Sequence, residues 1–212
     1  YEKSLGFYLT RARQAYAQQI KIYESVLSKY AQSSSGLVEL GAGYGSKIIR
    51  LSNLPVMKDL PLAAAEYTQS GCNLMNLLAQ KTGKSIKVGR CDFTELDVSG
   101  FDIPEGSIIY TSYSVHYVPK LKAEFVDFLN NFKPRVVVHF EPCYEYFNPN
   151  SLHGLMCKRY MELNGYTTNI ASTIVKGCDR IGASIEIQKN VFGANPFLPF
   201  SVIKWSPSSL DI

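Results

Sequence analysis

The 212-residue chain has the length of a single domain and can bury a sizeable hydrophobic core. Hydrophobic residues make up 46% of it and charged residues 19%, which excludes an intrinsically disordered chain. Lys and Arg are scattered and the net charge is only +4, so no nucleic-acid surface is expected, and no apolar run approaches the roughly 18 residues of a membrane span.

The five cysteines form no recognisable disulfide or zinc pattern. They are odd in number, widely spaced and without a Cys-x-x-Cys pair, at positions 72, 91, 143, 157 and 178. We therefore expect reduced thiols, a cytoplasmic protein, no metal site and no membrane partner. No signal peptide is visible. The chain begins at Tyr1 without a methionine, so a place in a longer chain stays open. The sequence also leaves a homodimer open.

The first predicted element is a long amphipathic helix over residues 3–30. Apolar residues recur there at steps of three and four, and Arg, Lys and Gln occupy the other faces. We expect this N-terminal helical cap, residues 1–32, to pack against the sheet of a core formed by residues 36–212. Its tyrosines are expected in the core, with contact to a bound ligand as the alternative.

A glycine-rich segment follows the first predicted strand, residues 37–40. Gly41, Gly43 and Gly45 stand between this strand and a helix predicted over residues 46–54. Glycine accepts positive φ angles and lets the backbone approach a ligand closely, and the start of a helix presents free N–H groups. The segment therefore predicts a nucleotide-like cofactor, with a ligand-free turn as the alternative.

The spacing of these glycines limits which class of cofactor fits the segment. A dinucleotide fingerprint needs a glycine five residues after Gly41, where Ser46 stands, and the Gly-Lys-Ser/Thr of a P-loop is absent. With Glu39 as the leading acid, the segment instead resembles the Glu/Asp-x-Gly-x-Gly-x-Gly signature of class I S-adenosylmethionine (SAM)-dependent methyltransferases. The resemblance implies SAM as cofactor and S-adenosylhomocysteine (SAH) as product.

The resemblance also implies roles for the residues of this segment. Glu39 supports the cationic methionine portion of SAM, directly or through water. The backbone of the turn touches the cofactor, and its residues are Gly41, Ala42, Gly43 and Gly45.

An acidic residue ends the second predicted strand, residues 61–67. It is Glu66, followed by Tyr67. A carboxylate at this strand end can accept two hydrogen bonds from a ribose diol. By the resemblance, Glu66 and Tyr67 contact the ribose side of SAM, and an unengaged surface acid is the alternative.

A second acidic residue follows the third predicted strand, residues 85–91. It is Asp92, with Phe93 beside it. The resemblance implies that Asp92 accepts a hydrogen bond from the adenine amino group and that Phe93 packs on the adenine ring. The alternative is an ordinary Asp-Phe pair in a loop.

The loops after the fourth and fifth predicted strands, residues 107–112 and 134–140, are expected to face the transferable methyl group. Ligands bind at the carboxyl ends of strands in open α/β sheets, which also places Ser112 beside the cofactor. The candidate catalytic residues on these loops are Tyr113, His116, Glu141 and Glu145.

Two late segments complete the predicted fold. Residues 184–188 and 200–205 alternate between apolar and polar side chains, after helices predicted at 151–163 and 169–180. Their order matches an antiparallel hairpin. The resemblance then implies an α/β fold, a Rossmann-like seven-stranded, mostly parallel sheet with helices on both faces and a C-terminal antiparallel hairpin.

The acceptor is expected to be a small molecule. Glu141 and Glu145, flanked by Tyr144 and Tyr146, suit a cationic acceptor and favour N-methylation of an amino- or guanidino-bearing compound such as arginine or a related amino acid. One alternative is an O-methyltransferase of a hydroxylated natural product with His116 as general base, because histidine titrates near neutral pH. The other alternative is a non-catalytic SAM-binding module within a longer protein.

Overall fold

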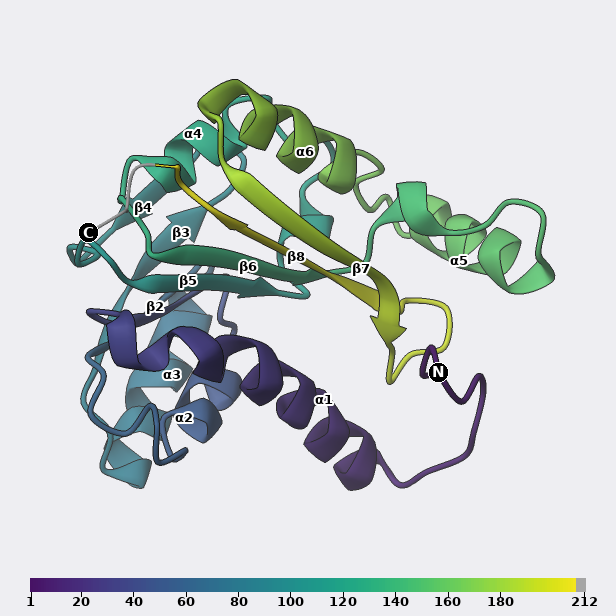
Figure 1. Ribbon diagram of the computed structural model, residues 1–212. Coiled ribbons are helices and arrows are strands. Elements are labelled where there is room, and N and C mark those ends of the chain that lie inside the picture. Colours follow the sequence, from purple (N-terminus) through teal and green to yellow (C-terminus); the bar gives the residue numbers. More distant parts are fainter. Residues whose placement is uncertain (209–212) are drawn as a thin grey trace.

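One eight-stranded sheet runs through the computed structural model, which describes residues 1–208 (Figure 1). Its order is β4-β3-β2-β1-β5-β6-β8-β7. The strands are β1 (Leu37–Leu40), β2 (Leu62–Glu66), β3 (Ile86–Asp92), β4 (Asp97–Ser99), β5 (Ile108–Ser112), β6 (Val136–Glu141), β7 (Ser184–Phe192) and β8 (Phe200–Ser206). The helices are α1 (Ala12–Leu27), α2 (Ser46–Leu51), α3 (Gln69–Thr82), α4 (Phe125–Asn130), α5 (Leu152–Leu163) and α6 (Ile170–Ile181), with 3₁₀ turns η1 (Ser28–Ser33), η2 (Val115–Tyr117) and η3 (Tyr144–Tyr146).

The five central strands, β3-β2-β1-β5-β6, pair in parallel. Strands β1, β5 and β6 are buried along their whole length, as apolar strands covered on both faces should be. The chain moves outward from β1 first through β2 and β3 and later through β5 and β6. The order therefore reverses beside β1, and loops from both halves of the sheet meet at its carboxyl end, where open α/β sheets bind ligands.

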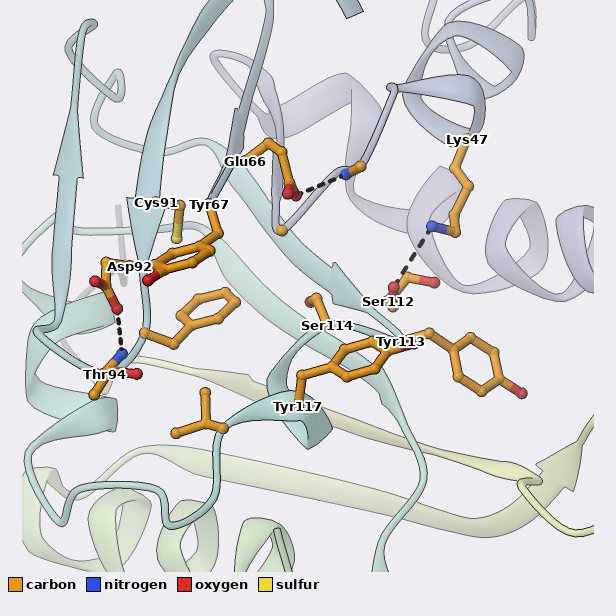
Figure 2. A pocket seen from close by; sticks show the side chains of 14 residues that line it. Lys47, Glu66, Tyr67, Cys91, Asp92, Thr94, Ser112, Tyr113, Ser114 and Tyr117 are labelled. Carbon is orange, nitrogen blue, oxygen red and sulfur yellow. Dashed lines mark hydrogen bonds between the residues drawn. The ribbon is translucent and has the colours of Figure 1, made fainter. Parts of the chain in front are cut away.

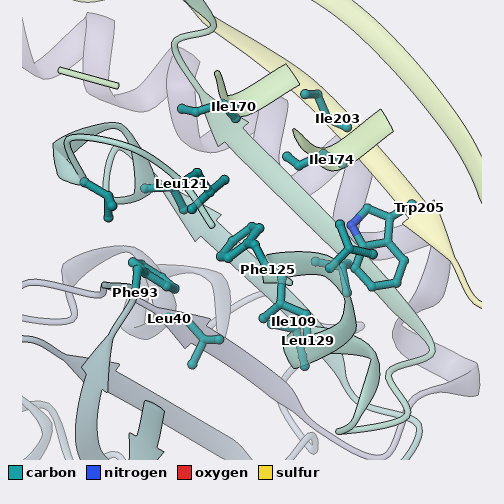
Figure 3. Close-up of a cluster of buried hydrophobic side chains, with 14 of the residues drawn as sticks. Leu40, Phe93, Ile109, Leu121, Phe125, Leu129, Ile170, Ile174, Ile203 and Trp205 are labelled. Carbon is teal, nitrogen blue, oxygen red and sulfur yellow. The ribbon is translucent and has the colours of Figure 1, made fainter. Parts of the chain in front are cut away.

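Helices cover both faces of this sheet (Figure 1). On one face, α4 and α6 supply Phe125, Leu129 and Ile174 to a core that also contains Trp205 of β8 (Figure 3). On the other face, α1, α2 and α3 pack in a second core that includes Tyr23 of α1. Alternate strand residues belong to alternate cores because successive side chains of a strand point to opposite faces. Helix α5 extends beyond the edge of the sheet (Figure 1).

The predicted fold class is confirmed, with one strand more than expected. The C-terminal hairpin is present, since β8 pairs antiparallel with both β6 and β7. The additional strand β4 has three residues and pairs antiparallel with β3. Helix α4 begins only at Phe125, because the side chain of Asn169 takes both backbone hydrogen-bonding groups of Leu121. All five cysteines are free and buried.

The N-terminal prediction is wrong for residues 3–11, which are not helical; α1 begins at Ala12. Gly6 has a φ of 72°, and the segment instead follows the β7–β8 connection. The amide N–H of Lys3 donates to the Val191 carbonyl oxygen at 3.1 Å, and that of Gly193 donates to the Tyr1 oxygen at 3.0 Å. These contacts are far apart in sequence, so the helical spacing of apolar residues could not reveal them. Within residues 1–208, no helix is both long and apolar enough to cross a membrane.

His139 lies inside β6 as a neutral imidazole. The indole N–H of Trp205 donates to its Nε2 at 3.2 Å, and its Nδ1 lies 3.0 Å from the Thr111 hydroxyl. An indole can only donate, so Nε2 must be unprotonated. Burial lowers the pKa of His139 to about 4. The unfolded chain, with a histidine pKa of about 6.5, therefore takes up a proton that the folded chain resists.

We expect this histidine to make the fold acid-sensitive. The stability it supports is complete above pH 6.5 or so and is lost as the pH falls towards 4, by about 2 kcal/mol between pH 7 and pH 5. Urea unfolding of the wild type and of His139→Gln at these two pH values measures it. The variant should lose this part of the pH dependence, and an identical dependence in both proteins would contradict the assignment.

Candidate functional site

A cavity of about 530 Å³ lies at the carboxyl ends of β1, β2, β3 and β5 (Figure 2). It is placed where the strand order reverses. Its lining residues are Gly41, Gly43, Lys47, Glu66, Tyr67, Cys91, Asp92, Phe93, Thr94, Ser112, Tyr113, Ser114, Tyr117 and Val118.

The glycine turn forms one wall, and its three glycines have different surroundings. All have positive φ, 72° at Gly41, 59° at Gly43 and 79° at Gly45. A β-carbon at Gly41 would lie 2.3 Å from that of Ser114, and one at Gly45 would lie 2.6 Å from Met75 Cγ. At Gly43 it would meet nothing within 4 Å. Gly41 and Gly45 therefore allow close packing, whereas the position of a Gly43 side chain is open space at the cavity.

Glu66 holds this turn from the end of β2. Its Oε2 accepts the N–H of Gly43 at 3.0 Å, and its Oε1 accepts the N–H and the hydroxyl of Thr68 at 3.2 and 3.1 Å. Each carboxylate oxygen can accept more than one hydrogen bond. The half-buried carboxylate thus fixes the turn and keeps capacity for hydroxyl groups in the cavity.

Asp92 and Phe93 form the opposite wall at the end of β3. One oxygen of Asp92, Oδ1, accepts the N–H groups of Thr94 and Glu95 at 2.7 and 3.2 Å. Within residues 1–208, the other oxygen receives no hydrogen bond from the protein. Phe93 is buried against the glycine turn and lines the cavity. The wall therefore offers one free acceptor beside an aromatic ring.

Glu39 lies behind the turn, fully buried and paired with a cavity residue. Its Oε2 accepts the Tyr110 hydroxyl at 2.9 Å and the Ile48 N–H at 3.2 Å, and its Oε1 lies 3.5 Å from Lys47 Nζ. Burial raises the pKa of Glu39, while Lys47 and these hydrogen bonds oppose the shift. Oε1 has no hydrogen bond in the described chain. The pair places one cation in the cavity wall and one under-satisfied carboxylate behind it.

The loop after β5 closes the cavity with Ser112, Tyr113, Ser114 and Tyr117 (Figure 2). Tyr113 has a φ of 52°, an unfavourable backbone conformation for a large side chain. Its hydroxyl donates to the Leu198 carbonyl oxygen at 3.0 Å, and burial raises its pKa. The loop is thus strained at a residue that both lines the cavity and contacts the β7–β8 connection.

His116 and Glu141 form a buried pair outside the cavity lining. Nδ1 of His116 lies 3.2 Å from Glu141 Oε2, and the carboxylate also accepts the N–H groups of Ser114 and Val115 at 3.0 to 3.2 Å. Burial alone would raise the pKa of Glu141, but its partners, His116 first, lower it below the usual value. Glu141 therefore stays ionised and shapes the loop. Nε2 of His116 has no hydrogen-bond partner within residues 1–208.

Glu145 has a different neighbourhood from Glu141. Its Oε1 accepts the N–H and hydroxyl of Ser172 at 3.0 and 3.1 Å, in the first turn of α6. The two carboxylates that the sequence suggested as a pair therefore contact separate elements, and neither lines the cavity described above.

The structure brings most of the expected cofactor residues to one cavity: Gly41, Gly43, Glu66, Tyr67, Asp92, Phe93 and Ser112. Glu39, Ala42 and Gly45 support the turn from outside the lining. Of the expected catalytic residues, only Tyr113 lines the cavity. Tyr117, on the loop that was expected to face the methyl group, lines it as well. Lys47 also lines it and was not predicted from the sequence, although it stands two residues after Gly45 and its charge was a usable signal.

Several solved structures with a similar fold are methyltransferases. Magnesium protoporphyrin IX methyltransferase from Synechocystis PCC 6803, solved with SAH, is 13% identical over 96% of this chain and 90% of its own, with a TM-score of 0.66. The methyltransferase domain of bacterial CtHen1 is 16% identical over 91% and 98%, with a TM-score of 0.60. A SAM-dependent methyltransferase from Aquifex aeolicus is 13% identical over 89% and 97%, with a TM-score of 0.57.

At these sequence identities, the similarity establishes the fold. The chain has the fold of class I SAM-dependent methyltransferases. No protein-family model and no curated protein matches the sequence.

Proposed function

We propose that this protein is a SAM-dependent methyltransferase that acts on a small molecule. The observation that carries the proposal is the meeting of Gly43, Glu66 and the Asp92–Phe93 pair around one cavity in a chain of this fold. An open glycine backbone, a carboxylate for a diol and a free acceptor beside an aromatic ring match the parts of SAM. When bound, SAM supplies an electrophilic methyl group on a sulfonium.

The ion pair of the buried Glu39 with the partly exposed Lys47 matches the remaining part of the cofactor. The methionine portion of SAM is a zwitterion, and a carboxylate and an ammonium 3.5 Å apart offer it both opposite charges. Lys47 lines the cavity and would hold the cofactor carboxylate, while the under-satisfied Oε1 of Glu39 favours the ammonium side. This assigns Lys47 to cofactor binding, a role the sequence did not suggest.

The residues beside the expected methyl position mainly orient the acceptor and exclude water. Methyl transfer from a sulfonium is an in-line displacement, so alignment supplies most of the rate enhancement. Ser112, Tyr113, Ser114 and Tyr117 shield this end of the cavity. Tyr113 remains a neutral phenol because burial raises its pKa.

The His116–Glu141 pair supports O-methylation as the second candidate activity. Glu141 engages Nδ1 and leaves Nε2 unpartnered among the described residues, which is the arrangement of an oriented general base. The His116 ring packs against the rings of Tyr117 and Tyr166, with centroids 4.2 and 4.6 Å away. Since His116 is fully buried, the loop after β5 must shift before Nε2 can reach an acceptor hydroxyl.

The prediction of N-methylation of an amino- or guanidino-bearing acceptor such as arginine rests on Glu141 and Glu145. Glu141 is already hydrogen-bonded by its own loop, and Glu145 is bonded to Ser172. These two carboxylates therefore cannot both bind one guanidinium unless both loops rearrange. An amine acceptor would need other residues to bind it.

Replacing Glu66 with glutamine should weaken SAH binding by about tenfold. The amide keeps the shape of the carboxylate but removes the charge-assisted hydrogen bonds to ribose and turns one acceptor into a donor. Isothermal titration calorimetry measures the affinity. Glu95→Gln is the control, because Glu95 is exposed and outside the cavity lining, and equal affinities in both variants would argue against the ribose role.

The activity is tested with methyl-labelled SAM and pooled metabolites, including amino acids and hydroxylated aromatic compounds. A labelled product identified by mass, together with SAH release, supports the enzyme. Tight SAM binding without SAH formation from any acceptor would support a non-catalytic module instead. Failure of the wild type to bind SAM or SAH would refute the proposal.

A further inference from the structure

A second cavity of about 620 Å³ lies on the other half of the same sheet edge. The carboxyl end of β6 pairs with the start of β8, Glu141 with Ser201, and the end of β7 pairs there too, Phe192 with Phe200. The cavity is bounded by Phe192 at the end of β7, by the β7–β8 connection, by the start of α1 and by the N-terminal segment. The first residues of that segment run beside the β7–β8 connection (Figure 1). Its lining residues are Tyr1, Phe7, Tyr8, Leu9, Thr10, Ala12, Ala15, Tyr16, Gln19, Phe192, Gly193, Ala194 and Pro196.

This lining has a distinct chemistry. Aromatic and aliphatic side chains predominate, and no Asp, Glu, Lys or Arg side chain belongs to it in the described part of the chain. A cavity of this size and composition suits a small, largely apolar ligand. A guanidinium would lose its hydration there without gaining a carboxylate partner, which is costly.

A buried hydrogen-bond chain joins the second cavity to the first. Gln19 lines the second cavity with 7% of its surface exposed, and its amide N–H donates to the Tyr23 hydroxyl at 2.6 Å. Tyr23 in turn lies 2.6 Å from the hydroxyl of Ser112, which lines the first cavity. Burial raises the pKa of Tyr23 well above its usual value, so the chain consists of neutral groups.

Two further tyrosines lie between the cavities. Tyr16 lines the second cavity, and its hydroxyl donates to that of Ser46, which follows the glycine turn, at 3.3 Å. Tyr113 lines the first cavity and packs edge-on against Phe200, with ring centroids 5.8 Å apart. Side chains of α1, of β5 and of the loop after β5 therefore stand between the two cavities, at the end where Ser112 and Tyr113 lie.

We propose that the second cavity is a second ligand site, which binds an uncharged aromatic compound that carries a hydroxyl group. The rings of Tyr8, Tyr16 and Phe192 supply the apolar surface. The amide oxygen of Gln19 accepts no hydrogen bond within residues 1–208 and receives the ligand hydroxyl. The site goes beyond the proposed methyltransferase function, because the side chains of Tyr23 and Ser112 separate its ligand from the first cavity.

The test uses 2-naphthol as a neutral aromatic alcohol and L-arginine as a charged comparison, titrated calorimetrically into the SAH-bound protein. Ala12→Trp and Ala194→Trp place an indole into the cavity from opposite walls, and both positions are exposed, so the core is unaffected. Ser25→Trp is the matched control, an exposed position on α1 that lines neither cavity.

Saturable binding of 2-naphthol to the wild type is expected, at least tenfold weaker in both cavity variants and unchanged in Ser25→Trp. L-arginine should show none. Gln19→Leu should weaken 2-naphthol by about fivefold, the effect of one lost hydrogen bond, while naphthalene binds as before. SAH affinity should stay within twofold in the tryptophan variants.

Equal 2-naphthol affinity in the wild type and both cavity variants would overturn the inference, as would the absence of 2-naphthol binding or preferential binding of L-arginine. A protein that fails to bind SAH refutes the methyltransferase proposal separately. The same 2-naphthol titrations without SAH then still decide whether the second cavity takes this class of ligand.

Discussion

Substitution of Gly43 by valine is expected to abolish cofactor binding, with SAH affinity reduced at least about 100-fold. Gly43 borders the first cavity, and a β-carbon there would meet no protein atom within 4 Å. The isopropyl group therefore extends into the space where we place the cofactor, and its steric exclusion cannot be relieved by a neighbouring side chain. Calorimetric titration of SAH into the folded variant measures the loss.

The control for this substitution is Gly83→Val. Gly83 ends α3 with a φ of 65°, close to the 59° of Gly43, and a β-carbon at Gly83 would likewise meet no atom within 4 Å. Both variants therefore carry a similar backbone penalty for valine at positive φ. Only Gly43→Val should lose SAH. Retained affinity in Gly43→Val, or equal loss in both, would refute the assignment of this cavity to SAM.

Substitution of Glu141 by glutamine is expected to destabilise the fold by about 3 kcal/mol, because it leaves buried donors without an ionised acceptor. The Glu141 carboxylate is fully buried and accepts hydrogen bonds from Ser114 and Val115 beside His116. Urea unfolding at pH 7 measures the change in the free energy of unfolding.

Glu145→Gln is the matched comparison, since both residues were candidates for acceptor binding. Within residues 1–208, Glu145 bonds only to Ser172 near the start of α6, so its loss should cost no more than about 1 kcal/mol. A stable Glu141→Gln with abolished methyl transfer would contradict the structural role given to Glu141. Equal destabilisation in the two variants would also contradict it.

The cofactor side of the candidate site could be predicted from sequence for a physical reason. Glu66 and Asp92 each follow a buried strand, and neighbouring parallel strands end at the same edge of the sheet. Strand order alone therefore brings their side chains to the glycine turn. The local conformation of that turn was equally predictable, because Gly41, Gly43 and Gly45 all need positive φ.

The N-terminal segment and the loops expected to bind the acceptor depend on contacts that no local pattern encodes. Residues 3–11 have helical spacing of apolar side chains, yet pairing of Lys3 with Val191 directs the segment to the β7–β8 connection. Glu141 and Glu145 are close in sequence, but the chain turns at η3 and sends them to different partners. In both cases the structure depends on which distant segment a residue contacts. The spacing of apolar residues along the chain does not predict such contacts.

The hydrogen-bond chain from Gln19 through Tyr23 to Ser112 has a direction. The amide N–H of Gln19 donates to the Tyr23 oxygen, and Ser112 is the hydrogen-bond acceptor available to the Tyr23 hydroxyl within residues 1–208. The Ser112 hydroxyl is then left to donate into the first cavity. Rotation of the Gln19 amide would reverse the direction of this hydrogen-bond chain. Occupancy of one cavity therefore alters the hydrogen-bond donor offered in the other. Linkage requires the influence to be equal in both directions.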